Sequence, residues 1–250
     1  MKFGFLTINN LRPKVLHLFC ASIKRLREGV GIDFPAVCVS NPSDAVICSE
    51  YNVHHIIQPN VPASEKWNTG LGYLRTLDLD YVVISGSDDI FSTQALGSIL
   101  SKVDTNPDLI GFDAMYVYCA EGAYKGTLKR LTTKGEFGVG KTVSKKVLDA
   151  VDWCAWKYDS PRNFGMDAIF SRNTAFHIKN RVMAEGVIVD VKTSDSLNKF
   201  TMFERNHHGV NVDKSIFYNI LGEEERRLLS YVEGRIPSLD QWLNTIQKKR

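Results

Sequence analysis

The chain has 250 residues and a formal net charge of +3, with 44% hydrophobic and 24% charged residues. These values are near the average for globular proteins, and the charge is too small to indicate a nucleic-acid partner by itself. The apolar run at residues 3–8 is too short for a signal peptide, and no stretch approaches a membrane span. The five scattered cysteines contain no Cys-x-x-Cys pair, which indicates reduced core thiols in a cytoplasmic protein.

The first hundred residues alternate between strands and helices. We expect strands at residues 2–8, 35–40, 53–58 and 81–86. We expect helices at residues 13–28, 65–77 and 92–103, and a short helix after the turn at 41–44. This alternation predicts an α/β fold whose parallel sheet has helices on both faces.

The second half has a different pattern. Strand-like runs at residues 109–120 and 124–132 are separated by Glu-Gly-Ala, which favours antiparallel pairing. Helices are expected at 143–152 and 166–176, followed by a strand at 182–192. An amphipathic helical tail begins near residue 213, and a last short segment at 239–246 precedes a basic terminus.

The strand at 81–86 leads into two adjacent carboxylates, Asp88 and Asp89. In open α/β sheets, ligands bind just beyond the carboxyl ends of the strands. Two acids at such a place persist most easily when a cation neutralises them, and their hard oxygen ligands suit Mg or Mn. The alternative is that the acids cap the helix expected from Ser92.

The run Lys66-Trp67-Asn68-Thr69-Gly70-Leu71, followed by a helix, an apolar strand and Gly86-Ser87-Asp88-Asp89, resembles the GT-A fold glycosyltransferases. It is most similar to small, family-2-like members, some of them phage-encoded. The resemblance implies a Rossmann-like mixed sheet flanked by helices. It also implies a nucleotide-sugar-binding half at 1–108, an antiparallel acceptor-binding half at 109–212 and a helical tail at 213–250. One departure is Gly86, which stands where the family places an Asp, so Asp88 binds the metal alone or with Asp89.

The resemblance also implies roles for residues near the donor. Seven positions would contact the nucleotide or its diphosphate: Thr7, Asn9, Ser40, Asp44, Lys66, Asn68 and Ser87. The alternatives are that Asn9 and Asp44 are ordinary turn residues and that Lys66 is a solvated helix lysine.

Sugar transfer needs a base for the acceptor hydroxyl. The candidate is Asp167, which stands at an expected helix start; the alternative is that Asp167 only caps that helix. The pair His207 and His208 lies where several GT-A enzymes bring a histidine to the metal, although such a pair is more often a surface feature. The aromatic side chains of Trp67, Trp153, Trp156 and Tyr158 would form a sugar-stacking wall or simply part of the core.

A competing motif is the run 135–142, which matches the Gly-x-x-x-x-Gly-Lys-Thr phosphate loop position for position. It would make the chain an NTPase or a small-molecule kinase, with Asp190 on the acidic strand. The preceding strand carries Lys125, Lys129 and Arg130, however, whereas a phosphate-loop strand is normally buried and apolar. A third alternative is a sugar-nucleotide-binding module without turnover.

We therefore predict an inverting, metal-dependent (Mn or Mg) glycosyltransferase. It would move a sugar from a nucleotide-diphosphate sugar, such as a UDP-sugar, to a hydroxyl acceptor. A glycan or small molecule is the preferred acceptor, and DNA carrying hydroxymethylated bases is the alternative. In the DNA case five cations would have to contact phosphates: Arg162, Lys179, Arg181, Lys192 and Lys199.

Overall fold

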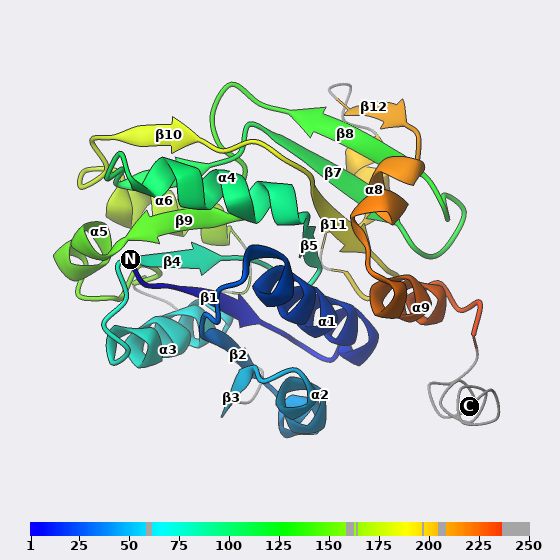
Figure 1. The fold of residues 1–250 in the computed structure, drawn as a ribbon, viewed down its shortest axis with the longest axis horizontal. Coiled ribbons are helices and arrows are strands. Elements are labelled where there is room, and N and C mark those ends of the chain that lie inside the picture. Colours follow the sequence, from blue (N-terminus) through cyan, green and yellow to red (C-terminus); the bar gives the residue numbers. More distant parts are fainter. Residues whose placement is uncertain (59–61, 159–162, 164, 197, 205–208, 237–250) are drawn as a thin grey trace.

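The chain forms two mixed β-sheets with helices packed around them (Figure 1). The computed structural model describes residues 1–58, 62–158, 163, 165–196, 198–204 and 209–236. No helix within these ranges is long and apolar enough to cross a membrane.

The first sheet has seven strands in the order β10-β6-β9-β4-β1-β2-β3. Its parallel part consists of β1 (Phe3–Ile8), β2 (Ala36–Ser40), β3 (His54–Ile57) and β4 (Tyr81–Ile84), as the sequence predicts. Beyond β4 the sheet continues with β9 (Lys141–Ser144), β6 (Leu109–Gly111) and β10 (Arg181–Met183). Strand β9 runs antiparallel to both of its neighbours, which makes the sheet mixed.

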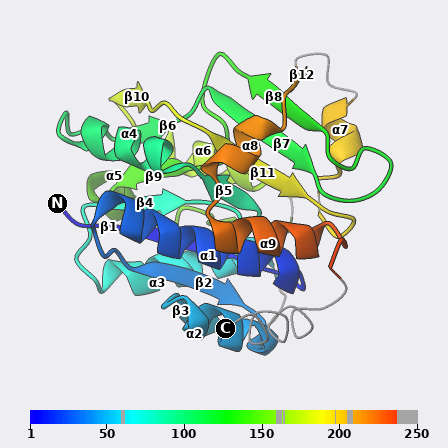
Figure 2. The same ribbon diagram turned by 45° about the vertical axis from the view of Figure 1, so that its right-hand side comes forward.

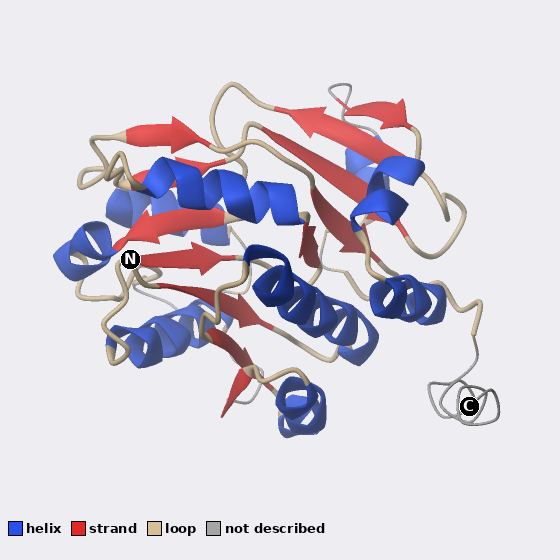
Figure 3. Cartoon of the chain, viewed as in Figure 1, coloured by secondary structure: helices blue, strands red, loops and turns tan. Residues whose placement is uncertain are grey.

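Helices cover both faces of this sheet (Figures 1 and 3). Helices α1 (Pro13–Val30) and α4 (Thr93–Val103) lie on one face, and α3 (Ala63–Arg75), α5 (Lys145–Ala150) and α6 (Met166–Thr174) lie on the other. The alternation of side chains along β1 explains this, because Phe3 and Phe5 enter the core under α1 while Leu6 enters the core under α3. The short elements η1 (Pro42–Asp44) and α2 (Ala45–Glu50) connect β2 to β3.

The second sheet has five strands in the order β12-β8-β7-β11-β5. These strands are β12 (Gly209–Val212), β8 (Leu128–Thr132), β7 (Ala114–Cys119), β11 (Ile188–Lys192) and β5 (Asp89–Phe91). The antiparallel pairing of β7 with β8 confirms the prediction for that hairpin. Helices α7 (Phe200–Glu204) and α8 (Ser215–Ile220) lie beside this sheet (Figure 2).

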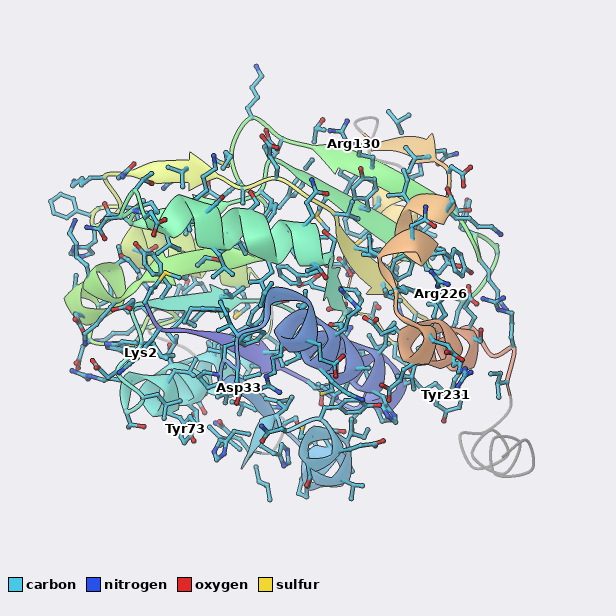
Figure 4. The ribbon with its side chains drawn as sticks, in the orientation of Figure 1. Lys2, Asp33, Tyr73, Arg130, Arg226 and Tyr231 are labelled. Atoms are coloured by element: carbon cyan, nitrogen blue, oxygen red, sulfur yellow. The ribbon has the colours of Figure 1, made fainter. Side chains whose placement is uncertain are left out.

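The last described helix, α9 (Glu223–Val232), lies alongside α1, as Figure 2 shows. The Arg25 Nε donates to Glu225 Oε2 at 2.6 Å, and both side chains are largely buried. The Lys14 ammonium lies 4.7 Å from the centre of the Tyr231 ring, which projects from α9 in Figure 4. The described part of the tail, residues 213–236, is therefore mainly helical, as its amphipathic pattern predicts, and α9 packs against α1.

Several predicted elements divide differently in the structure. The expected strand at 109–120 forms two strands, β6 in the first sheet and β7 in the second. The expected strand at 182–192 likewise forms β10 in the first sheet and β11 in the second. Gly186 lies between the latter two with a φ of +126°, and an added Cβ would lie 2.6 Å from the backbone of Ala95. The sheets consequently do not divide at residue 108, since β6, β9 and β10 join the first sheet. The expected helix at 143–152 begins at Lys145, and the segment 239–246 lies outside the described residues.

Candidate active site

A cavity of about 380 Å³ opens where the two sheets meet. Strand β4 ends at Ile84, and the short loop after it leads into β5, which belongs to the second sheet. This change of sheet brings the carboxyl end of β4 against β11. The cavity walls include three acids and two cations: Asp88, Asp89, Asp190, Arg12 and Lys192.

The three acids form one buried cluster. Asp89 and Asp190 stand opposite each other in the antiparallel pairing of β5 with β11. Each of the three carboxylates offers an oxygen that lies within 4.8 Å of the others. Burial raises the pKa of Asp89 and that of Asp190, and the neighbouring carboxylates add to this effect.

Two cations from distant parts of the chain neutralise most of this charge. The Arg12 Nη1 donates to Asp88 Oδ2 at 2.8 Å, and the Lys192 Nζ lies 3.4 Å from the same oxygen and 2.6 Å from Asp190 Oδ2. Burial alone would raise the pKa of Asp88, but Lys192 and Arg12 outweigh it and hold that pKa below its ordinary value. With three acids and two cations, the cluster keeps one negative charge when all five groups are ionised.

Gly86 is required by the packing of these acids. Its N–H donates to Asp89 Oδ2 at 2.6 Å, and a Cβ at this position would lie 2.6 Å from Asp88 Oδ1. A side chain at residue 86 would therefore collide with both carboxylates. The acid that the family pattern places there is absent, and Asp190 supplies a third carboxylate from β11, the strand that pairs with β5.

The alternative in which the acids cap the next helix is wrong. The N-cap of α4 is Ser92, whose Oγ accepts from the Ala95 N–H at 3.0 Å. Asp89 lies in β5, three residues before this cap. Asp88 and Asp89 therefore do not cap α4.

A second cavity of about 190 Å³ adjoins the first, and Ile8, Arg12, Ala63 and Asn163 line both. Asn9, Asn10, Lys66 and Asp195 complete the wall of the second cavity. Because Arg12 lines both cavities, a guanidinium lies between the acidic cluster and the second cavity.

Four of the predicted donor residues form one hydrogen-bonded group beside this cavity. The Asn9 Nδ2 donates to Asp44 Oδ2 at 2.9 Å, and the Ser87 Oγ donates to Asn9 Oδ1 at 3.0 Å. The Lys66 Nζ donates to the Asn9 carbonyl at 2.9 Å, and Lys66 is 1% exposed. Lys66 is thus no solvated helix lysine, and it holds the turn after β1 in place.

The other three predicted donor residues line neither cavity. Thr7 and Ser40 are buried, and the Ser40 Oγ lies 2.9 Å from Nε2 of His55. The Asn68 Oδ1 accepts from the backbone N–H of Trp156 at 3.0 Å. Asn68 therefore holds the chain near Trp156, which is a different contact from the one the resemblance implies.

The candidate base, Asp167, lines the larger cavity together with the acids. It is in the first turn of α6, its side chain is 71% exposed, and its Oδ1 accepts from the Lys141 Nζ at 3.1 Å. The loop before β9 passes directly over this carboxyl, since a Cβ on Gly138 would lie 2.2 Å from Asp167 Oδ2. The N-cap of α6 is Gly165, so Asp167 does not cap the helix.

The predicted aromatic wall is only partly present. Trp67 lines the larger cavity and stacks on Trp156, with ring centres 5.1 Å apart and an interplanar angle of 19°. Trp153 is buried, and its Nε1 donates to Asp149. Tyr158 lies under the guanidinium of Arg172. Only Trp67 of the four lines the cavity.

The phosphate-loop interpretation of residues 135–142 is wrong. A phosphate loop needs a helix that begins at its Lys-Thr pair, but Lys141 and Thr142 open β9, and the preceding strand β8 belongs to the other sheet. The Lys141 ammonium is bound to Asp167. Asp190, the acid of the NTPase alternative, belongs instead to the carboxylate cluster.

Two other predictions concern the histidine pair and the basic residues. His207 and His208 lie outside the described residues, as does Arg162. Lys192 is 5% exposed and bound to the acids, so it does not belong to a surface that could bind DNA phosphates. The Arg181 Nη1 is bound to both carboxylate oxygens of Glu136.

Sequence reasoning did not identify Arg12, and it assigned other roles to Lys192 and Asp190. The available signal was in β11, whose five residues, Ile-Val-Asp-Val-Lys, place an acid and a cation inside a strand that is buried throughout. Charged residues are almost never fully buried unless they are paired, so such a strand indicates an internal charge cluster.

The acidic cluster fits a divalent cation. Its ligands are hard carboxylate oxygens, which suit Mg or Mn. Oδ1 of Asp190 is buried and has no hydrogen-bond partner among the described residues. A buried carboxylate oxygen without a partner is costly, and a bound cation would satisfy it.

The two sheets, the helices on both faces and a site at their junction define a GT-A fold, which confirms the predicted fold class. Solved structures with this fold include TarS 1–349 from S. aureus, at 14% identity and a TM-score of 0.52. The UDP complex of TarS 1–349 has a TM-score of 0.54 at 13% identity, and each match covers 93% of this chain and 65% of TarS 1–349. The chain spans only 44% of a longer TarS structure, with a TM-score of 0.52. No protein-family model and no curated protein matches the chain.

Proposed function

We propose that the chain is a glycosyltransferase that moves a sugar from a nucleotide-diphosphate sugar to a hydroxyl acceptor. The observation that carries this proposal is the buried group of three acids and two cations at the carboxyl end of β4, next to a second cavity. Ligands of open α/β sheets bind at such strand ends. The UDP complex of the structurally similar TarS supports a UDP-sugar as the donor. The resemblance to small, phage-encoded family-2 members stays a prediction.

In this proposal the donor spans both cavities. The nucleoside occupies the cavity beside Asn9 and Lys66, and the diphosphate lies at Arg12, which lines both cavities. Asp88, with Asp89 and Asp190, would hold Mn or Mg at the diphosphate. When bound, such an ion neutralises the charge that develops on the departing diphosphate.

Asp167 is the proposed general base. Asp167 lines the larger cavity, and its exposed carboxyl accepts the proton of the acceptor hydroxyl. The hydroxyl oxygen then attacks the anomeric carbon from the side opposite the diphosphate, which inverts its configuration. Lys141 orients the carboxyl through the contact at 3.1 Å.

We propose a glycan or a small molecule as the acceptor. The DNA alternative depended on five cations, of which Lys192 is buried and Arg181 is bound to Glu136. Trp67 offers a ring in the cavity wall, and aromatic rings of this kind pack well against the apolar faces of sugars.

Calorimetric titration with UDP-, GDP-, CDP- and TDP-sugars, each with and without Mn²⁺, tests the proposal. We expect one nucleotide class to bind and Asp88→Asn to abolish the Mn-dependent part of the binding. The control is Asp104→Asn, which changes an exposed carboxyl at the end of α4. Undiminished Mn-dependent binding by Asp88→Asn would contradict the site. Donor binding without sugar transfer or donor hydrolysis would instead identify a non-catalytic binding module.

A further inference from the structure

Lys192 ends β11 with its ammonium buried inside the acidic cluster. Its side chain is 6% exposed, and Nζ lies 2.6 Å from Asp190 Oδ2 and 3.4 Å from Asp88 Oδ2. Burying an ammonium is costly unless carboxylates compensate for the lost water. The place of Lys192 therefore depends on the charge of these acids.

The ammonium touches two of the three carboxylates that would hold a divalent ion. Mg-type ions bind carboxylate oxygens at about 2.0–2.1 Å. An ion bound to Asp190 Oδ2 would therefore lie within about 4.7 Å of Lys192 Nζ in its present position. Two cations so close together in a buried site repel each other strongly. The divalent ion and the ammonium thus compete for the same two carboxylates, those of Asp88 and Asp190.

The Phe203 ring lies next to the ammonium within the same cavity and would hold it after displacement. Lys192 Nζ lies 5.6 Å from the centre of the Phe203 ring, and both residues line the cavity of about 380 Å³. The face of an aromatic ring attracts a cation. Arg12 differs, because it is held by both Asp88 Oδ2 and Ser87 Oγ. A lysine side chain can turn from the acids toward the ring without leaving the site.

We propose that Lys192 is an exchangeable counter-ion of the metal site. It neutralises Asp88 and Asp190 while the ion is absent. The arriving ion displaces it from these carboxylates, and the freed ammonium then binds the diphosphate of the donor. The inference rests on the proposed function, because it assumes a diphosphate in this cavity.

This exchange predicts opposite effects of one substitution on two ligands. Lys192→Met removes the competitor, so Mn²⁺ should bind the nucleotide-free protein at least about tenfold more tightly than it binds the wild type. The same change removes a charged donor to phosphate, so UDP should bind about tenfold more weakly at saturating Mn²⁺. A lysine that served only to support the fold would weaken both ligands together.

The experiment measures Mn²⁺ binding by electron paramagnetic resonance and UDP binding by calorimetry, on the whole chain. Lys192→Gln accompanies Lys192→Met, because it removes the charge but keeps an N–H donor for Asp190 if the methionine variant does not fold. Lys141→Met is the matched control, since it removes another buried lysine that is bound to Asp167 rather than to the cluster. We expect its Mn²⁺ affinity to equal that of the wild type.

Unchanged or weaker Mn²⁺ binding by both Lys192 variants would contradict the proposal that the ammonium and the ion compete for the carboxylates. Unchanged UDP binding by these variants would overturn the contact with the diphosphate. In both cases the wild type would still bind Mn²⁺ and UDP, so the proposed function would stand. If neither the wild type nor any variant binds Mn²⁺ and UDP, the proposed function fails and the inference fails with it.

Discussion

Gly138 lies so close to the carboxyl of Asp167 that a single added methyl group would displace it. A Cβ added at Gly138 would lie 2.2 Å from Oδ2 of Asp167 and 2.5 Å from Cγ, whereas ordinary contact begins at 3.4 Å. The carboxyl therefore has to move by roughly 1 Å, a misplacement that can lower turnover by about 10²-fold when it affects a reacting group. Because the side chain of Asp167 is 71% exposed, it can move into solvent, and the free energy of unfolding should change by no more than about 0.5 kcal/mol.

The assay compares the turnover of sugar transfer with the affinity for the donor. Gly135→Ala is the matched control in the same loop, because its Cβ would meet nothing within 4 Å. We expect Gly138→Ala to lose turnover with unchanged donor affinity and Gly135→Ala to resemble the wild type. Full turnover in Gly138→Ala would refute the placement of Asp167 at the reacting hydroxyl.

Three further predictions test the base, the core and the pH dependence of stability. Asp167→Asn should lower turnover by about 10²–10⁴-fold at unchanged donor affinity, and an equal loss of affinity would place Asp167 at the nucleotide instead. In α3, Gly70→Ala would place a Cβ 2.2 Å from the Leu6 side chain, so it should lower the free energy of unfolding by about 1–3 kcal/mol in urea titration. Gly72→Ala is the control in the same helix, because its Cβ would meet nothing within 4 Å and should leave stability unchanged or increase it. Burial lowers the pKa of His17 below 6.5, so the unfolded chain binds the proton more readily. As the pH drops below about 6.5, this group should reduce the free energy of unfolding by at most about 1.4 kcal/mol per pH unit. If His17→Gln shows the same pH dependence of stability, another group is responsible.

The first half of the fold was predictable because its signals are local. Pro13 begins α1 and Ser92 caps α4, and short apolar runs mark the strands between the helices. In the second half the β7–β8 pairing and the tail helices were predictable, but the division of strands between the sheets was not. One apolar pattern continues through residues 109–120, although the chain changes sheets between β6 and β7. Which sheet a strand joins depends on long-range packing, and single-chain patterns do not contain that information.

The same distinction holds for the site. Asp88 and Asp89 were found because they follow a strand directly, and the structure places both in the acidic cluster. Arg12 and Lys192 come from positions 76 and 104 residues away from Asp88, and their contacts exist only after the two sheets meet. The absence of an acid at Gly86 was visible in the sequence. That Asp190 supplies a third carboxylate followed only from the pairing of β5 with β11.

Anomalous diffraction from crystals grown with UDP and Mn²⁺ tests the central claim most directly. We predict a manganese peak bound by Asp88 and by at least one of Asp89 and Asp190, with the diphosphate of UDP beside Arg12. A peak elsewhere, or UDP phosphates held by the loop at residues 135–140, would contradict the proposed donor site.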